Sequence, residues 1–206
     1  MQIKKSNTFS IILLAAGESS RLGTPKQLLM YKGKNLIQHT IDLTQILNMD
    51  TFIVLGAYNE KILAQVNIYN ARIVENEEWN EGLASSIRKG LEHVLTSNPD
   101  SEAVILALCD QPFLSTEILQ QILEKYYDSG LPIVHCQYRE ASGPPTLFHQ
   151  SMFPYLMELK GGQGAKKVVE MFPDRVGSVD FPQGSLDIDT PEDYQQLLNM
   201  KNDHTF

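Results

Sequence analysis

Cysteine is scarce in this chain of 206 residues, which contains Cys109 and Cys136 alone. Two cysteines are too few for the disulfide framework of a small secreted domain. Each lies in an apolar run, so we interpret both as buried small hydrophobic residues. The five histidines show no metal-ligand spacing with one another or with the cysteines, which argues against a structural zinc site.

Long apolar runs are also missing. No window approaches the ~20 continuous apolar residues that a membrane helix needs. The run at 9–16 follows two lysines, but it lacks a signal-peptide cleavage pattern, so we expect a cytoplasmic protein. With 42% hydrophobic residues, the chain can bury one sizeable core. We therefore predict a single domain over 1–200, followed by a polar, frayed tail at 201–206.

An excess of positive charge is absent as well. The net charge is −8, and the isoelectric point is about 5.1. Proteins that bind nucleic acid without sequence preference are normally basic, so we expect no nucleic-acid partner. Because no apolar run is long enough for a membrane helix, we expect no membrane partner either. An acidic enzyme can still bind phosphates if its cations are concentrated in one place or if it holds a metal ion.

Short apolar runs alternate with amphipathic segments along the chain. The runs at 9–15, 52–55, 72–74, 103–108, 131–136 and 176–179 predict strands. Several are apolar on both faces, as in parallel strands covered by helices. Helical stripes cover 36–44, 87–95 and 118–126, and a last helix should begin at Pro191, after a Thr190 cap. We predict an α/β fold with a mainly parallel sheet and helices on both faces. Ligands of such sheets bind beyond the carboxyl ends of the strands.

The loop after the first strand combines small residues with cations. It lies within LLAAGESSRLGTPKQLL, residues 13–29. Ala15, Ala16 and Gly17 have little or no side chain, so their backbone N–H groups can approach a polyphosphate closely. Arg21 and Lys26 can neutralise phosphate oxygens. The loop fits neither GxGxxG nor GxxxxGK[ST], and a flexible surface turn with two solvated cations would share its composition.

The full pattern LAAGESSRLGTPKQLL closely resembles the signature of the MobA-like nucleotidyltransferases, and within them the molybdenum cofactor cytidylyltransferases. Later segments resemble further motifs of that family: NEEWNEGLASSIRKGL at 76–91, LALCDQPFL at 106–114, GPPTLF at 143–148 and LDIDTPEDY at 186–194. The resemblance implies a Rossmann-like nucleotidyltransferase fold and Mg²⁺-dependent transfer of a nucleotidyl group from an NTP to a phosphorylated acceptor.

For that branch the resemblance implies CTP as donor and molybdopterin, or its molybdenum-loaded form, as acceptor. Pyrophosphate is released, and the cytosine dinucleotide cofactor serves xanthine-dehydrogenase-type molybdoenzymes. Such an enzyme would be a handover partner. The catalytic contribution of Arg21 and Lys26 would be to stabilise charge on the phosphates.

A carboxylate at the end of the strand at 103–108 is well placed to hold Mg²⁺ on phosphates. That residue is Asp110, although an aspartate before a proline-containing turn is also common for structural reasons. The resemblance favours the metal role. It also makes Asp189 the second ligand and Asp187 the alternate.

The resemblance assigns the remaining contacts to two segments. The nucleobase would be read by Asn80, Gly82, Ser85 and Ser86, although a serine here could simply cap the helix that follows. The acceptor would meet Gly143, Pro144 and Asp187. The family usually has Gly-Asp where this chain has glycines at 161–162, so its acceptor site departs from the family pattern.

Three other readings remain. A nucleotidyltransferase of the same fold could use GTP, or could act on a sugar or polyol phosphate. A non-catalytic carrier or chaperone of the molybdenum cofactor could keep the same fold. A dinucleotide-dependent oxidoreductase is disfavoured because the chain lacks GxGxxG.

Overall fold

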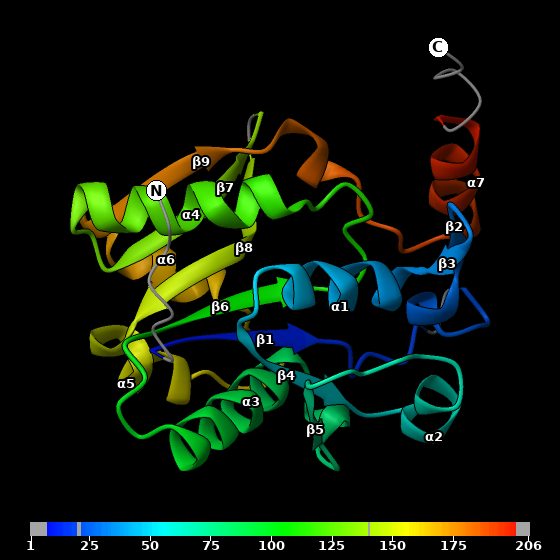
Figure 1. Ribbon diagram of the computed structural model, residues 1–206, viewed down its shortest axis with the longest axis horizontal. Coiled ribbons are helices and arrows are strands. Elements are labelled where there is room, and N and C mark those ends of the chain that lie inside the picture. Colours follow the sequence, from blue (N-terminus) through cyan, green and yellow to red (C-terminus); the bar gives the residue numbers. More distant parts are fainter. Residues whose placement is uncertain (1–7, 20–21, 140, 201–206) are drawn as a thin grey trace.

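A seven-stranded sheet forms the centre of the computed structural model, which describes residues 8–19, 22–139 and 141–200 (Figure 1). The strand order is β5-β4-β1-β6-β8-β7-β9. The strands are β1 (Phe9–Leu14), β4 (Asp50–Leu55), β5 (Arg72–Glu75), β6 (Ala103–Leu108), β7 (Ile133–Tyr138), β8 (Ala141–His149) and β9 (Val176–Asp180). Arg21 and the tail at 201–206, both subjects of prediction, lie outside the described residues.

Helices cover both faces of this sheet, as predicted (Figure 1). The helices are α1 (Leu36–Ile46), α2 (Asn59–Leu63), α3 (Leu83–Ser97), α4 (Thr116–Ser129), α5 (Phe153–Met157), α6 (Lys166–Met171) and α7 (Pro191–Met200), of which all but α7 pack on the sheet. The strand β1 shows why two layers form: Ile11 and Leu13 pack with α1 and α4, whereas Ile12 and Leu14 pack with α3 and α5. Since neighbouring side chains of a strand point to opposite faces, a fully apolar strand needs a cover on each side.

The pairings confirm a mainly parallel sheet. β1 pairs in parallel with β4 and β6, β4 with β5, and β7 with β9. β8 runs antiparallel to both of its neighbours. This strand is absent from the predicted set, because ASGPPTLFH carries a glycine and two prolines, which are rare in strands. Its apolar end lies between β6 and β7, and that burial outweighs the weak strand propensity of its start.

The last helix packs apart from the sheet. In Figure 1 the red α7 lies beside the short hairpin of β2 (Met30–Tyr31) and β3 (Lys34–Asn35). A small core joins them, made of Tyr31, Leu36, Ile188 and Leu197. The packing of α7 therefore sets the position of the segment just before it, which carries Asp187 and Asp189.

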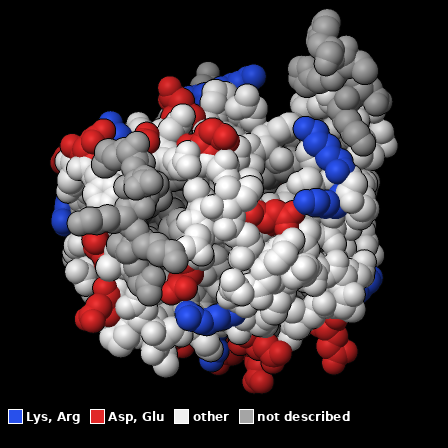
Figure 2. Space-filling model, in the orientation of Figure 1, with Lys and Arg blue, Asp and Glu red and all other residues white. Residues whose placement is uncertain are grey.

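The surface carries both signs of charge, and on the face shown in Figure 2 the acidic and basic side chains are scattered among uncharged groups. In the described part of the chain, no helix is long and apolar enough to cross a membrane.

Candidate nucleotide and metal site

Lys26 lies between two carboxylates that come from distant parts of the chain. Its Nζ donates to Asp110 Oδ2 at 2.5 Å and to Asp189 Oδ1 at 3.0 Å. Asp110 follows β6, Asp189 precedes α7, and Lys26 opens the short 3-10 turn Lys26–Leu28 (η1). These three residues were predicted to act together, and the fold brings them together at the carboxyl ends of the parallel strands.

The charge state of this cluster follows from its surroundings. Burial by itself would lower the pKa of Lys26, but the charge of Asp110 and the hydrogen bonds to both acids outweigh it, so its pKa is raised. Lys26 therefore keeps its positive charge throughout the neutral range. The neighbouring Cys109 is fully buried, which raises the pKa of its thiol to about 12 and leaves it an uncharged packing residue.

The two acids suit a divalent cation. Asp110 is buried, and its Oδ1 has no hydrogen-bond partner in the described structure. An unpaired carboxylate oxygen in a buried position costs free energy unless a ligand meets it. Within the described residues no group of three or more His, Cys, Asp or Glu side chains could hold a metal ion. An ion here would therefore need phosphate oxygens and water besides Asp110 and Asp189, which is how Mg²⁺ usually binds.

The loop after β1 lines a cavity of about 370 Å³ with Ala15, Ala16, Gly17 and Glu18. Its carbonyls are already occupied: Ala15 and Gly17 accept from the side-chain amide of Gln27, and Ala16 accepts from Ala57 N. In contrast, the N–H groups of Ala16, Gly17 and Glu18 find no acceptor in the part of the chain that is described. Successive free N–H groups of this kind form an anion-binding concavity.

Another wall of this cavity comes from the segment before α3 and from the first turn of α3. The lining residues there are Trp79, Asn80, Gly82, Leu83 and Ser86. Gly82 has a φ of 113°, and a Cβ at this position would come within 2.6 Å of Gly161 O, so only glycine fits.

The helix cap predicted for this segment is wrong. The residue before α3 is Gly82, and Ser85 and Ser86 lie inside the first turn. Both hydroxyls accept from the buried side chain of Asn76, and Ser85 also donates to Glu78 O. Ser85 does not line the cavity, whereas Ser86 does. Ser85 and Asn76 therefore hold this wall of the cavity in shape, and Ser86 can meet a ligand.

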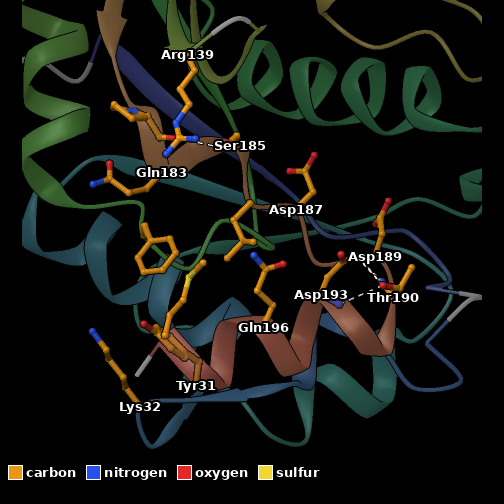
Figure 3. Close-up of a pocket in the computed structure, with 14 residues that line it drawn as sticks. Tyr31, Lys32, Arg139, Gln183, Ser185, Asp187, Asp189, Thr190, Asp193 and Gln196 are labelled. Atoms are coloured by element: carbon orange, nitrogen blue, oxygen red, sulfur yellow. Dashed lines mark hydrogen bonds between the residues drawn. The ribbon is translucent and has the colours of Figure 1, made fainter. Parts of the chain in front are cut away.

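The residues predicted for the acceptor separate into two places. Asp187 lines an open groove of about 1430 Å³, together with Tyr31, Lys32, Arg139 and Asp189. Figure 3 shows Asp187 and Asp189 reaching in the same direction, away from α7. Asp187 has an exposed surface, but the protein atoms around its carboxyl group partly desolvate it; this desolvation, and then the charge of Asp110, raise the pKa of Asp187 to about 6. Gly143 and Pro144 line a smaller cavity elsewhere.

Two buried glutamines escaped the sequence-based prediction. Gln27 follows Lys26, and Gln111 follows Asp110. Gln111 donates to Tyr138 Oη at 2.8 Å and to the carbonyl oxygen of Pro144 at 2.9 Å. The signal was present in the Pro-Lys-Gln and Asp-Gln-Pro sequences, but only the folded chain shows what each side-chain amide binds.

A domain-family comparison now decides the family. Residues 11–177 match the model of the MobA-like NTP transferase domain. The chain belongs to this family. That assignment confirms the predicted resemblance and the Rossmann-like nucleotidyltransferase fold.

Curated relatives span nearly the full chain. Nicotine blue oxidoreductase of Paenarthrobacter nicotinovorans is 30% identical, over 91% of this chain and 95% of the relative. Purine catabolism protein PucB of Bacillus subtilis (strain 168) is 27% identical, over 90% and 94%. A probable molybdenum cofactor guanylyltransferase of Bacillus cytotoxicus is 23% identical, over 92% and 96%.

Solved structures agree with the fold. Rv0371c of Mycobacterium tuberculosis H37Rv superposes with a TM-score of 0.81 at 29% identity, covering 93% of this chain and 98% of its own. A structure of Rv0371c in complex with manganese has a TM-score of 0.78 at 27% identity, with coverage of 93% and 98%. A structurally similar protein therefore forms a complex with manganese.

Proposed function

We propose that this chain transfers CMP from CTP to a molybdopterin-type phosphorylated acceptor with release of pyrophosphate, for the maturation of a xanthine-dehydrogenase-type molybdoenzyme. One observation carries the proposal. Lys26 joins Asp110 and Asp189 at the rim of the cavity whose loop offers free N–H groups. A cation, two acids and an anion-binding loop are the parts that nucleotidyl transfer requires.

The reaction follows from these parts. Triphosphate oxygens bind the loop at 15–18 and the ammonium of Lys26, with Arg21 as a second predicted cation. Asp110 and Asp189 would hold Mg²⁺, which supplies charge neutralisation on the phosphates. A phosphate oxygen of the acceptor attacks the α-phosphorus in line, a new P–O bond forms, and the bond to pyrophosphate breaks. The acceptor phosphate is already anionic near pH 7, so no strong general base is needed.

The nature of the acceptor rests on two kinds of support. The Pro-Lys-Gln loop resembles the cytidylyltransferase branch, and a curated relative is named a probable molybdenum cofactor guanylyltransferase. That relative supports the molybdenum cofactor as acceptor and keeps GTP open as the alternative donor. Asn80, Gly82 and Ser86 are the residues we propose for reading the base.

A nucleotide panel tests the proposal. The purified protein is incubated with each NTP, with and without molybdopterin, and pyrophosphate release is followed together with the mass of the product. We expect release with CTP and molybdopterin, loss of release after chelation of divalent ions, and recovery with added Mg²⁺. Release with GTP, or with a sugar phosphate as acceptor, would establish the corresponding alternative. Cofactor binding without pyrophosphate release would establish a carrier.

A redox function is the second candidate, because a relative at 30% identity is named an oxidoreductase. The protein can be assayed for oxidation of NADH and NADPH with quinone-type dyes as acceptors. Turnover at rates typical of enzymes would favour a redox function over nucleotidyl transfer.

A further inference from the structure

The cavity of about 370 Å³ that the loop after β1 lines is the proposed nucleotide site, and we call it the nucleotide cavity. A smaller cavity of about 140 Å³ lies beside it. We call it the side chamber. It shares Leu14, Leu83 and Leu108 with the nucleotide cavity, so the two spaces adjoin. A cavity of roughly 150 Å³ with apolar walls stays dry and holds one benzene-sized ring. The volume of the side chamber thus fits a single six-membered ring.

The hydrogen-bonded pairing of β7 with β8 is interrupted beside this chamber. Val134 pairs with Leu147, but the next pair is Cys136 with Gly143, so three residues of β8 face His135. Two of these three are prolines, which have no N–H to donate to a ladder. The local widening of β8 leaves space in front of His135.

His135 points into this space on the side of α6. Ile133 packs with α3 and α5, while Val134 and Cys136 pack with α4, so the alternation places His135 on the face that α3, α5 and α6 cover. Its Nδ1 is buried and has no hydrogen-bond partner among the described residues. Burial also lowers the pKa of His135, so the ring is neutral near pH 7. An empty cavity and an unpaired buried nitrogen both lower the stability of the fold. One ligand could fill the cavity and hydrogen-bond to the nitrogen.

The wall of the chamber is linked to the metal site. Pro144 lines the chamber, and its carbonyl oxygen accepts from Gln111, the residue after Asp110. A group in the chamber would therefore lie next to the segment that positions a proposed metal ligand. This placement is expected for part of a substrate that reacts there.

We propose that the side chamber binds a compact six-membered ring of the acceptor, which presents one hydrogen-bonding atom to Nδ1 of His135. This inference rests on the proposed function. The acceptor is favoured over the nucleobase because Gly143 and Pro144 line the chamber, whereas Asn80, Gly82 and Ser86 line the adjoining cavity. The lining also includes Ser142, Thr146 and Lys166, whose side chains can hydrogen-bond to further polar groups of a heterocyclic ring.

Direct binding of phenol tests the chamber without any catalysis. Phenol is one ring with one hydroxyl, and its binding can be followed by calorimetry on the wild-type protein, His135→Phe and His135→Leu. We expect binding to the wild type and its loss in His135→Phe, because the larger phenyl ring narrows a chamber that has room for one ring and offers no nitrogen to the hydroxyl. His135→Leu should keep the space and bind about tenfold more weakly, because one buried hydrogen bond is gone.

Thermal unfolding and kinetics complete the test. His135→Phe should melt at a higher temperature than the wild type, because it reduces the empty space and removes a buried nitrogen without a hydrogen-bond partner among the described residues. Its KM for the acceptor should rise about tenfold or more, while its KM for the NTP stays unchanged. The control is His93→Phe. His93 contacts Lys89 O within α3 and lines neither cavity, so this substitution should leave the KM for the acceptor and the KM for the NTP unchanged.

The outcomes separate the chamber from the proposed function. If phenol does not bind, or binds His135→Phe as well as the wild type, the chamber proposal is overturned. A rise in the KM for the NTP, or an unchanged KM for the acceptor, overturns the assignment to the acceptor. If no NTP yields pyrophosphate, the proposed function fails, and phenol binding alone then decides whether the chamber takes a ring.

Discussion

At the scale of single residues, two lysines show how burial separates the ion pair of the candidate site from a surface one. Lys26 and Lys34 both contact an aspartate at 2.5 Å. The Lys34 side chain is 55% exposed and that of Lys26 is 20% exposed. Exposed pairs contribute little because water screens them. Lys26 instead lies on the wall of the nucleotide cavity, where its charge can act on a ligand.

We predict that Lys26→Ala lowers the turnover of nucleotidyl transfer on the order of 100-fold or more, because it removes a preorganised charge from the phosphates. A steady-state assay of pyrophosphate release measures the effect. Lys34→Ala is the matched control and should keep full activity. Circular dichroism should show both variants folded, and near-normal turnover of Lys26→Ala would reject the assigned role.

At the scale of elements, the start of α7 positions Asp189. Thr190 and Asp193 form a reciprocal cap: the Asp193 carboxylate accepts from the N–H and the hydroxyl of Thr190, and Thr190 Oγ1 accepts from Asp193 N. The same carboxylate accepts from the N–H of Asp189 at 3.2 Å. The hydrogen bond from Thr190 lowers the pKa of Asp193, so this cap persists at neutral pH. The cap thereby fixes the backbone of the proposed metal ligand.

We predict that Thr190→Ala lowers the free energy of unfolding by about 1 kcal/mol, the usual loss for a helix cap. Urea denaturation gives the value. Thr96→Ala is a suitable control, because its exposed hydroxyl contacts a carbonyl within α3 and caps no helix start; it should change stability by less than about 0.5 kcal/mol. Equal stability of Thr190→Ala and the wild type would show that the cap contributes nothing.

At the scale of the whole molecule, the contact between α3 and the sheet sets how closely the first turn of α3 approaches the loop after β1, which lines the same cavity. Gly90 of α3 makes this approach possible. A Cβ at this position would lie 2.5 Å from Ile12 Cγ2 and 3.0 Å from Val54 Cγ2. The helix therefore lies directly on β1 and β4, and any larger residue would push it outward.

We predict that Gly90→Ala destabilises the protein by about 1–2 kcal/mol, since overpacking costs about 1–3 kcal/mol and the better helix propensity of alanine returns up to ~1 kcal/mol. Denaturant unfolding measures the change. Gly162→Ala should be nearly neutral, because a Cβ added at this position would meet no described atom within 4 Å. A stabilised Gly90→Ala would mean that the helix shifts without cost.

Sequence alone determined the elements whose signals are local. The apolar runs predicted β1 and β6, and Thr190 marked a helix start that the structure confirms. The loop motif indicated the family. These predictions succeeded because strand burial, helix caps and motif spacing depend on neighbours within a few residues.

The tertiary structure decided everything that depends on distant partners. Lys26 is 84 residues from Asp110 and 163 from Asp189, and only the packed sheet and α7 bring them within hydrogen-bonding distance. The strand β8 forms against its local propensity because β6 and β7 bury it. Long-range burial and hydrogen bonding outweigh local preference there, and no local pattern of residues records them.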